Sequence, residues 1–360
     1  SARVDDIPLL IELMKALGLP EILDRCLSKH GNHKGISNGM MATIWLAFIL
    51  SQGDHRKNQV RAWVSTRKNL LEKLLPVTIL ESDFTDDRLG ILLNYLSDTH
   101  SWCAIEAALW QKSLRIIPPN NGLASVRVDA TTVSGYHSIV EDSLMQLGNS
   151  KAHRPDLAQF KLMSASHQPS GCLIATDIHS GESADDPLYV PIIRRVQDIL
   201  KMIGVLYVGD CKMASLATRA YVAHSGNFYL APFPMTGKMK DLSENLISFA
   251  LENPGRVTEF TGDGVAGQGF EKVREETAEI DGKTFAWQER LLVVQFDDLA
   301  KRQRHDLDEN LKAAEKALLS LTTNPGRGKR IFRTEDELRG AVAAIMKEKS
   351  VEGLLPEGKE

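Results

Sequence analysis

The stretch VRVDATTV, residues 126–133, predicts a buried β-strand around which the rest of the fold is arranged. β-branched and apolar residues dominate it, and it lies between Pro119 and Gly135. Asp129 lies in its middle, where a carboxylate is costly to bury unless a cation or hydrogen-bond donors accompany it. An Asp at this place can also cap a turn or pair with an arginine, so this stretch alone leaves its role open.

A second stretch, VLYVGDCKM at residues 205–213, predicts another apolar strand that ends in Gly209 and Asp210. A carboxylate at the C-terminal end of a buried strand, just before a helix, is a common site position in α/β sheets. Asp210 can equally act as the N-cap of a helix that starts near Ala214. If the two strands are neighbours, Asp129 and Asp210 converge, and converging carboxylates repel unless a divalent cation lies between them.

The order of the predicted elements indicates an α/β fold. Apolar residues recur at helical spacing from about residue 6 to 115, and the pattern becomes strand-like after the linker at 118–122. Strands are predicted at 125–133, 160–165, 172–179, 205–209 and 228–231, and helices at 185–202 and 214–224. Three hairpin-linked strands, a crossover helix and a fourth strand are the order of the RNase H-like fold. A right-handed crossover places that fourth strand parallel beside the first.

Four regions follow from these patterns. We expect a helical N-terminal domain for DNA binding or dimerisation at 1–117, the first part of an RNase H-like mixed sheet flanked by helices at 123–235, a β-rich insertion at 236–296, and a charged helical arm with a C-terminal segment at 297–360. Hairpin turns at 262–264 and 281–282 support the insertion. The charged, amphipathic pattern of 299–321 supports the arm.

Composition limits the function classes. The chain has 360 residues and a net charge of −4, with no apolar run long enough for a transmembrane helix and no apolar signal-peptide core at its start. Its four cysteines are widely spaced, which predicts a reduced, cytoplasmic protein. The net charge argues mildly against a nucleic-acid binder, although local basic clusters occur at 56–68 and 301–333.

Seven short motifs are informative as a set. They are DDIPLL at 5–10, GDHR at 53–56, DFTDDRL at 83–89, RVDATT at 127–132, SKAHRPDL at 150–157, DDPLY at 185–189 and VGDCKM at 208–213. Together they resemble the bacterial insertion-sequence DDE transposases. Within these, the resemblance is to the superfamily named for insertion sequence four, in a branch with a helical N-terminal domain, and it runs along nearly the whole chain.

This resemblance implies an enzyme that cleaves and transfers DNA strands at insertion-sequence ends by two-metal phosphodiester chemistry with Mg²⁺ or Mn²⁺. Asp129 and Asp210 match the first two members of the family's Asp-Asp-Glu triad and are the expected catalytic and metal-binding residues. The implied partners are double-stranded DNA, at the element ends and at the target, and a second copy of the chain in an active homodimer. The implied location is the bacterial cytoplasm, with no membrane.

The third carboxylate departs from the family's pattern. In the family it lies on a helix after the β-rich insertion, in a motif of Tyr, Arg, Glu and Lys. Glu309 keeps the last spacing of that motif to Lys316, but other residues occupy the Tyr and Arg positions. We therefore expect the third carboxylate beyond Glu360, with Glu289 and Glu309 as weak candidates within the chain. A strand-edge surface charge for Glu289 and a helix salt bridge for Glu309 are the simpler interpretations.

Basic side chains near the predicted site and in the helical region are candidates for DNA contact. The residues expected to face phosphates are Lys151, Arg154, Lys212, Arg56 and Lys57. Lys212 is the best supported of these near the site, because it follows Asp210 closely. The loop that carries Arg154 can equally be a surface loop pinned by Asp156.

Two other functions remain open. A non-catalytic DNA-binding fragment or domesticated transposase would share the fold and the basic clusters without strand cleavage. An aspartyl phosphatase or phosphotransferase would use Asp129 as a nucleophile. The general acid expected two residues later is Thr131 here, which makes the phosphatase the less favoured of the two.

Overall fold

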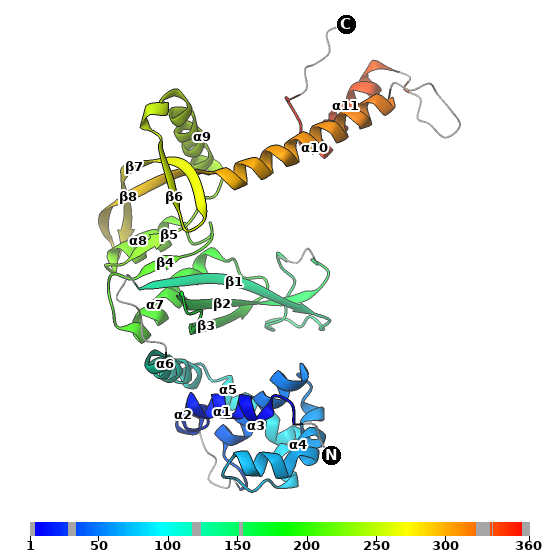
Figure 1. Ribbon diagram of the computed structural model, residues 1–360, viewed down its shortest axis with the longest axis vertical. Helices are drawn as coiled ribbons and strands as arrows, with labels where there is room; N and C mark the ends of the chain where they lie inside the picture. Colours follow the sequence, from blue (N-terminus) through cyan, green and yellow to red (C-terminus); the bar gives the residue numbers. More distant parts are fainter. Residues whose placement is uncertain are drawn as a thin grey trace. The chain divides into compact units, whose positions relative to one another are not determined.

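The computed structural model describes residues 4–27, 34–116, 124–150, 154–321, 332 and 334–354 (Figure 1). The chain divides into two compact units. The first contains Ser1–Pro234 and Thr277–Trp287, and the second contains Met235–Glu276 and Gln288–Glu360. Within the described ranges, no helix combines the length and the apolar character that a membrane span requires.

Helices occupy the described chain up to Ile116. They are α1 (Ile7–Ala16), α2 (Leu19–Cys26), α3 (Asn38–Gln52), α4 (Lys57–Leu74), the 3-10 helix η1 (Glu81–Phe84), α5 (Asp86–Leu96) and α6 (Thr99–Ile116). Helix α3 is apolar on nearly every side and is largely buried, and its Ile44 and Phe48 side chains lie in the hydrophobic core of the helical region. The Ser37 hydroxyl accepts the Met40 N–H at 3.2 Å and caps its start.

A five-stranded mixed sheet follows the helices. Its strands are β1 (Ser125–Gly135), β2 (Ala158–Gln168), β3 (Leu173–Ser180), β4 (Leu206–Val208) and β5 (Phe228–Leu230). Their order across the sheet is β3-β2-β1-β4-β5, with β1, β2 and β3 antiparallel and β4 and β5 parallel to β1. The prediction that the first and fourth strands are parallel neighbours is confirmed.

Helices flank this sheet. The crossover from β3 to β4 contains the 3-10 helix η2 (Asp186–Leu188) and α7 (Tyr189–Leu200), and α8 (Leu216–His224) connects β4 to β5. Ile192, Ile193 and Val196 recur at helical spacing on α7 and are fully buried in the core beneath the sheet. This apolar stripe fixes the rotation of α7 about its axis and therefore the position of Tyr189 at its first turn.

A polar network ties α6 and α7 to β3. Trp102 Nε1 donates a hydrogen bond to the Thr176 hydroxyl at 3.0 Å, and that hydroxyl donates to Glu106 at 2.5 Å. Arg195 of α7 forms ion pairs with Glu106 and with Asp177. Burial raises the pKa of Glu106, and the hydrogen bond from Thr176 and the charge of Arg195 oppose that rise.

The second unit contains most of a three-stranded sheet and the C-terminal helices. Its elements are α9 (Gly237–Glu252), the 3-10 helix η3 (Pro254–Arg256), β6 (Thr258–Gly262), β7 (Val265–Ile280), β8 (Lys283–Phe296), α10 (Asp297–Leu321) and α11 (Glu335–Glu348), with residues 277–287 of the β7–β8 hairpin in the first unit. The sheet order is β6-β7-β8, and tight turns at 263–264 and 281–282 join its strands as predicted. The region expected to be β-rich begins with a helix, because Met239, Leu242 and Leu246 recur at helical spacing.

Candidate functional site

The strand register brings the two predicted aspartates together. In the β1–β4 ladder, Val126 is paired with Tyr207 and Arg127 with Val208. The same offset, continued for two residues, places Asp129 opposite Asp210, just past the last residue of β4. Neighbouring strands lie about 4.8 Å apart, so side chains at facing positions are close enough to share a ligand.

Gly209 gives independent evidence for this close approach. A Cβ atom added at Gly209 would lie 3.1 Å from the carbonyl oxygen of Val128 and 2.6 Å from the Met213 sulfur. Only glycine therefore fits at the position before Asp210 without displacing its neighbours. The chain after β4 lies directly against β1, at the residue that precedes Asp129.

Asp129 lies on the open face of β1. Val126, Val128 and Ala130 are buried, whereas Arg127 and Asp129 are exposed. The expectation that Asp129 lies on a buried strand is therefore wrong for its side chain: β1 alternates, and only one of its faces is covered. The consequence is that the Asp129 carboxylate is open to solvent.

Asp210 is partly buried and is held through one of its two oxygens. The Tyr189 hydroxyl donates a hydrogen bond to Oδ1 at 2.7 Å, and the backbone N–H of Lys212 donates to the same oxygen at 2.9 Å. Both donors are neutral, and no lysine or arginine among the described residues forms an ion pair with Asp210. The carboxylate is therefore oriented while its negative charge remains uncancelled.

Tyr189 connects the start of α7 to the end of β4. Its side chain is fully buried. Burial raises the pKa of Tyr189 well above its ordinary value, and the hydrogen bond to Asp210 and the charges of Asp210, Asp129 and Asp185 raise it further. The hydroxyl therefore stays protonated at any physiological pH and remains a donor to Asp210.

A buried lysine lies next to this group. Lys161 of β2 is nearly inaccessible and forms an ion pair of 2.5 Å with Asp185, the residue before η2. The chemistry of a buried ammonium requires such a carboxylate partner. Because Asp185 holds Lys161, the positive charge of this lysine is already matched.

The residues expected to face DNA are distributed over several surfaces. Arg154 donates two hydrogen bonds to Asp156, at 2.8 and 2.7 Å, so its loop is pinned as the alternative interpretation expected. Lys212 Nζ lies 3.9 Å from Asp186, which keeps it beside the crossover turn near Asp210. Lys151 lies outside the described residues.

The two predicted phosphate contacts of the helical region are also in exposed pairs. Arg56 donates to both carboxylate oxygens of Asp54 and lowers the pKa of Asp54 to about 2. Lys57 Nζ lies 3.6 Å from Asp86. Exposed pairs of this kind are weak, so a phosphate can compete for either cation.

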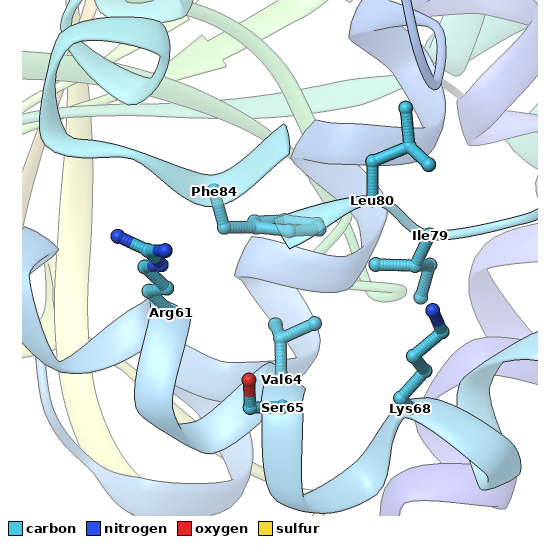
Figure 2. Close-up of a pocket in the computed structure, with 7 residues that line it drawn as sticks. All are labelled: Arg61, Val64, Ser65, Lys68, Ile79, Leu80 and Phe84. Atoms are coloured by element: carbon cyan, nitrogen blue, oxygen red, sulfur yellow. The ribbon is translucent and has the colours of Figure 1, made fainter. Parts of the chain in front are cut away.

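A small hollow lies beside this basic region, between α4 and η1 (Figure 2). Arg61 and Lys68 stand at opposite sides of it, and apolar side chains including Val64 and Phe84 form its floor. Its volume of about 30 Å³ admits water but is far below that of a small-molecule site. It therefore gives no evidence of a ligand.

The two weak candidates for a third carboxylate have other partners. Glu289 of β8 is buried and accepts a hydrogen bond from Arg274 Nε at 2.8 Å, so it is a buried ion pair and not the surface charge that the simpler interpretation expected. Glu309 is exposed on α10 and pairs with Lys312 at 2.9 Å.

The donor set of Asp129 and Asp210 fits a hard divalent cation. Mg²⁺ and Mn²⁺ prefer carboxylate oxygens and tolerate several water ligands, and Oδ2 of Asp210 accepts none of the hydrogen bonds described above. Among the described residues, no three His, Cys, Asp or Glu side chains gather closely enough to hold an ion. The pair would therefore leave most of a coordination shell to water.

Tyr189 and the Lys161–Asp185 pair are parts of the site that the sequence did not predict. Asp185 and Tyr189 belong to the DDPLY motif, but the sequence alone did not indicate that Asp185 pairs with Lys161 or that Tyr189 donates to Asp210. A charged residue within a strand, as Lys161 is, was the available signal for a buried partner.

Comparison with known proteins shows a distant structural likeness and no match in sequence. No protein-family model and no curated protein sequence matches the chain. Among solved structures, the chain is similar to the piggyBac transposase in a synaptic complex with hairpin DNA, at a TM-score of 0.33 and 9% sequence identity. The alignment covers 74% of this chain and 59% of that one. At this score the likeness is too slight to support an argument about fold or function.

Proposed function

We propose that the protein is a DDE-type transposase, a metal-dependent enzyme that cleaves and transfers DNA strands. The observation that supports this proposal is the parallel register of β1 and β4, because its offset, continued two residues past the last paired positions, brings Asp129 opposite Asp210. The order β3-β2-β1-β4-β5, with three antiparallel strands and two parallel ones, supports the proposal because it is the order expected for an RNase H-like core. The sequence motifs around both aspartates are those that resemble insertion-sequence transposases.

The chemistry assigned to the site follows from its charges. Asp129 and Asp210 would hold Mg²⁺ or Mn²⁺, and such ions activate a hydroxyl nucleophile and stabilise the leaving oxygen of a phosphodiester. Asp210 contributes an oriented carboxylate because two donors fix its Oδ1. Asp129 contributes a solvent-accessible carboxylate to which a long polymeric substrate has access.

The open face of β1 also supplies a phosphate-binding group. Arg127 is exposed two residues before Asp129, so both side chains project from the same face of the strand. Among the described residues, Arg127 has no carboxylate partner, in contrast to Arg154 and Arg56. We propose that its guanidinium binds a DNA phosphate beside the metal site.

A strand-cleavage assay tests this function. The full chain is incubated with double-stranded insertion-sequence ends and Mn²⁺, and nicked and joined products are separated on denaturing gels. We expect products that disappear in Asp129→Asn and in Asp210→Asn. Asp198→Asn is the control, because Asp198 is an exposed residue of α7 whose ion pair with Lys201 is also exposed. Cleavage that survives in both site variants would contradict the proposal.

A non-catalytic DNA-binding protein is the second candidate. It is favoured by the finding that no third acidic, His or Cys side chain of the described residues joins the aspartate pair. This alternative predicts salt-dependent DNA binding without nicks at any Mn²⁺ concentration. The identity of a third carboxylate stays a prediction.

A further inference from the structure

The hydrogen bonds at Asp210 are asymmetric. The Tyr189 hydroxyl, at 2.7 Å, and the Lys212 N–H, at 2.9 Å, both donate to Oδ1. A carboxylate with two donors on one oxygen has its rotation about the Cβ–Cγ bond restrained. Among the described residues, no hydrogen bond reaches its other oxygen, Oδ2.

Tyr189 is well suited to hold this orientation. It is the first residue of α7, is fully buried, and packs in the same core as Ile192 and Ile193. A buried tyrosine has few accessible rotamers, so the position of its hydroxyl is restricted. The hydroxyl is also neutral, so it orients Asp210 without cancelling the charge that a cation requires.

The Lys161–Asp185 ion pair matches the charge of a buried lysine. Lys161 is a buried lysine, and its ammonium forms an ion pair with Asp185 at 2.5 Å. A lysine committed to Asp185 does not neutralise Asp210. The ion pair with Asp185 thus holds the Lys161 ammonium, while the neutral Tyr189 hydroxyl orients Asp210.

We propose that Tyr189 is a positioning residue for the metal site, which fixes Asp210 so that Oδ2 is presented to a divalent cation shared with Asp129. The inference rests on the proposed function. Groups that orient metal-binding carboxylates through hydrogen bonds typically change metal affinity by about 10–100-fold when they are removed. Tyr189 should therefore act on metal affinity, through Asp210, without touching the metal or the DNA.

The chain contains a matched control. Tyr207 of β4 lies three residues before Asp210 and is also fully buried, but its hydroxyl has no hydrogen-bond partner among the described residues. Tyr207→Phe removes the same atom as Tyr189→Phe from the same core. Only the second substitution removes a donor from Asp210.

The test is a Mn²⁺ titration of the full chain by calorimetry, with thermal unfolding in EDTA measured on the same samples. Tyr189→Phe is expected to weaken Mn²⁺ binding at least tenfold, and Tyr207→Phe is expected to bind as the wild type does. The EDTA unfolding temperature identifies a temperature at which all variants are folded, so a general loss of stability does not imitate the result.

Two results would overturn the inference. Unchanged Mn²⁺ affinity in Tyr189→Phe would show that the hydroxyl does not orient the ligand, and equal weakening in both tyrosine variants would assign the effect to the core. Asp210→Asn separates these from a failure of the proposed function. If Asp210→Asn also binds Mn²⁺ as the wild type does, the metal site itself is wrong and the role of Tyr189 falls with it.

Discussion

Glu289 and Asp210 are both acidic side chains held within the protein, but the groups around them differ in charge. Glu289 in β8 is buried against the guanidinium of Arg274, whose Nη2 atom lies 2.7 Å from Oε2. Asp210, at the end of β4, accepts hydrogen bonds from a tyrosine hydroxyl and a backbone N–H, both neutral. The charge of Glu289 is matched by Arg274, whereas no lysine or arginine of the described part of the chain forms an ion pair with Asp210.

This difference separates a structural carboxylate from one prepared for a ligand. A buried acid that serves the fold needs a cation from the chain, because an unpaired buried charge is strongly destabilising. An acid oriented by neutral donors keeps a charge that an external cation can satisfy. The comparison therefore makes opposite predictions for equivalent substitutions in the β7–β8 hairpin and at the end of β4.

The largest effect is expected when the buried pair of the hairpin is broken. Arg274→Met removes the guanidinium that pairs with the buried Glu289 and should lower the free energy of unfolding by about 3 kcal/mol. The matched control is Arg290→Met on the same hairpin, because Arg290 forms an exposed pair with Glu271 at 2.5 Å and should cost less than about 1 kcal/mol. Urea unfolding followed by tryptophan fluorescence measures both, and equal losses would contradict the distinction.

Conversion of each acid to its amide should give opposite signs. Glu289→Gln weakens a hydrogen bond to a charged group and should lower the free energy of unfolding by about 2 kcal/mol. In EDTA, Asp210→Asn should leave stability unchanged or raise it by up to about 1 kcal/mol, since it removes repulsion from Asp129. The same urea measurement decides, and a loss in Asp210→Asn as large as that in Glu289→Gln would refute the account of Asp210.

A smaller effect is expected at the open face of β1. Arg127→Ala should weaken DNA binding about three- to tenfold and reduce the salt dependence by about one phosphate contact. Fluorescence anisotropy with labelled DNA at several salt concentrations measures both quantities. Arg339→Ala, on an exposed pair with Glu335 in α11, is the control. An identical change in the two variants would mean that Arg127 contributes only to net charge.

The smallest effect concerns the competition for Arg154. Its hydrogen bonds hold the pKa of Asp156 below the ordinary value, so Asp156 is ionised and paired near neutral pH. Asp156→Asn should release the guanidinium and tighten DNA binding about twofold at low salt. Weaker binding in this variant would show that the pair supports the loop and does not compete with DNA.

The adjacency of the two aspartates could be predicted because it depends on strand order. Hairpin turns and a single crossover helix leave few arrangements of the sheet, and the right-handed crossover rule selects the parallel neighbour of β1. The exposure of Asp129 was also encoded, since Val126, Val128 and Ala130 alternate with more polar residues. The prediction of a buried strand rested on the apolar content of the stretch. The alternation of apolar and polar residues, with a period of two, indicates that only one face of the strand is buried.

The surroundings of Asp210 could not be predicted in the same way. The hydrogen bond from Tyr189 joins the first turn of α7 to the end of β4, and it depends on how the stripe of α7 packs beneath the sheet. The pairing of Lys161 with Asp185 likewise joins a strand to a distant turn. Such contacts depend on tertiary packing, which the local spacing of residues in the sequence does not predict.

The central claim is that Asp129 and Asp210 form one cation site, and a calorimetric Mn²⁺ titration of the full chain tests it most directly. The account predicts a weak site in the wild type that both Asp129→Asn and Asp210→Asn remove, whereas Asp198→Asn, on the exposed surface of α7, retains it. Loss of Mn²⁺ binding in only one of the two site variants would show that the aspartates do not share an ion. Wild-type binding in both variants would contradict the claim altogether.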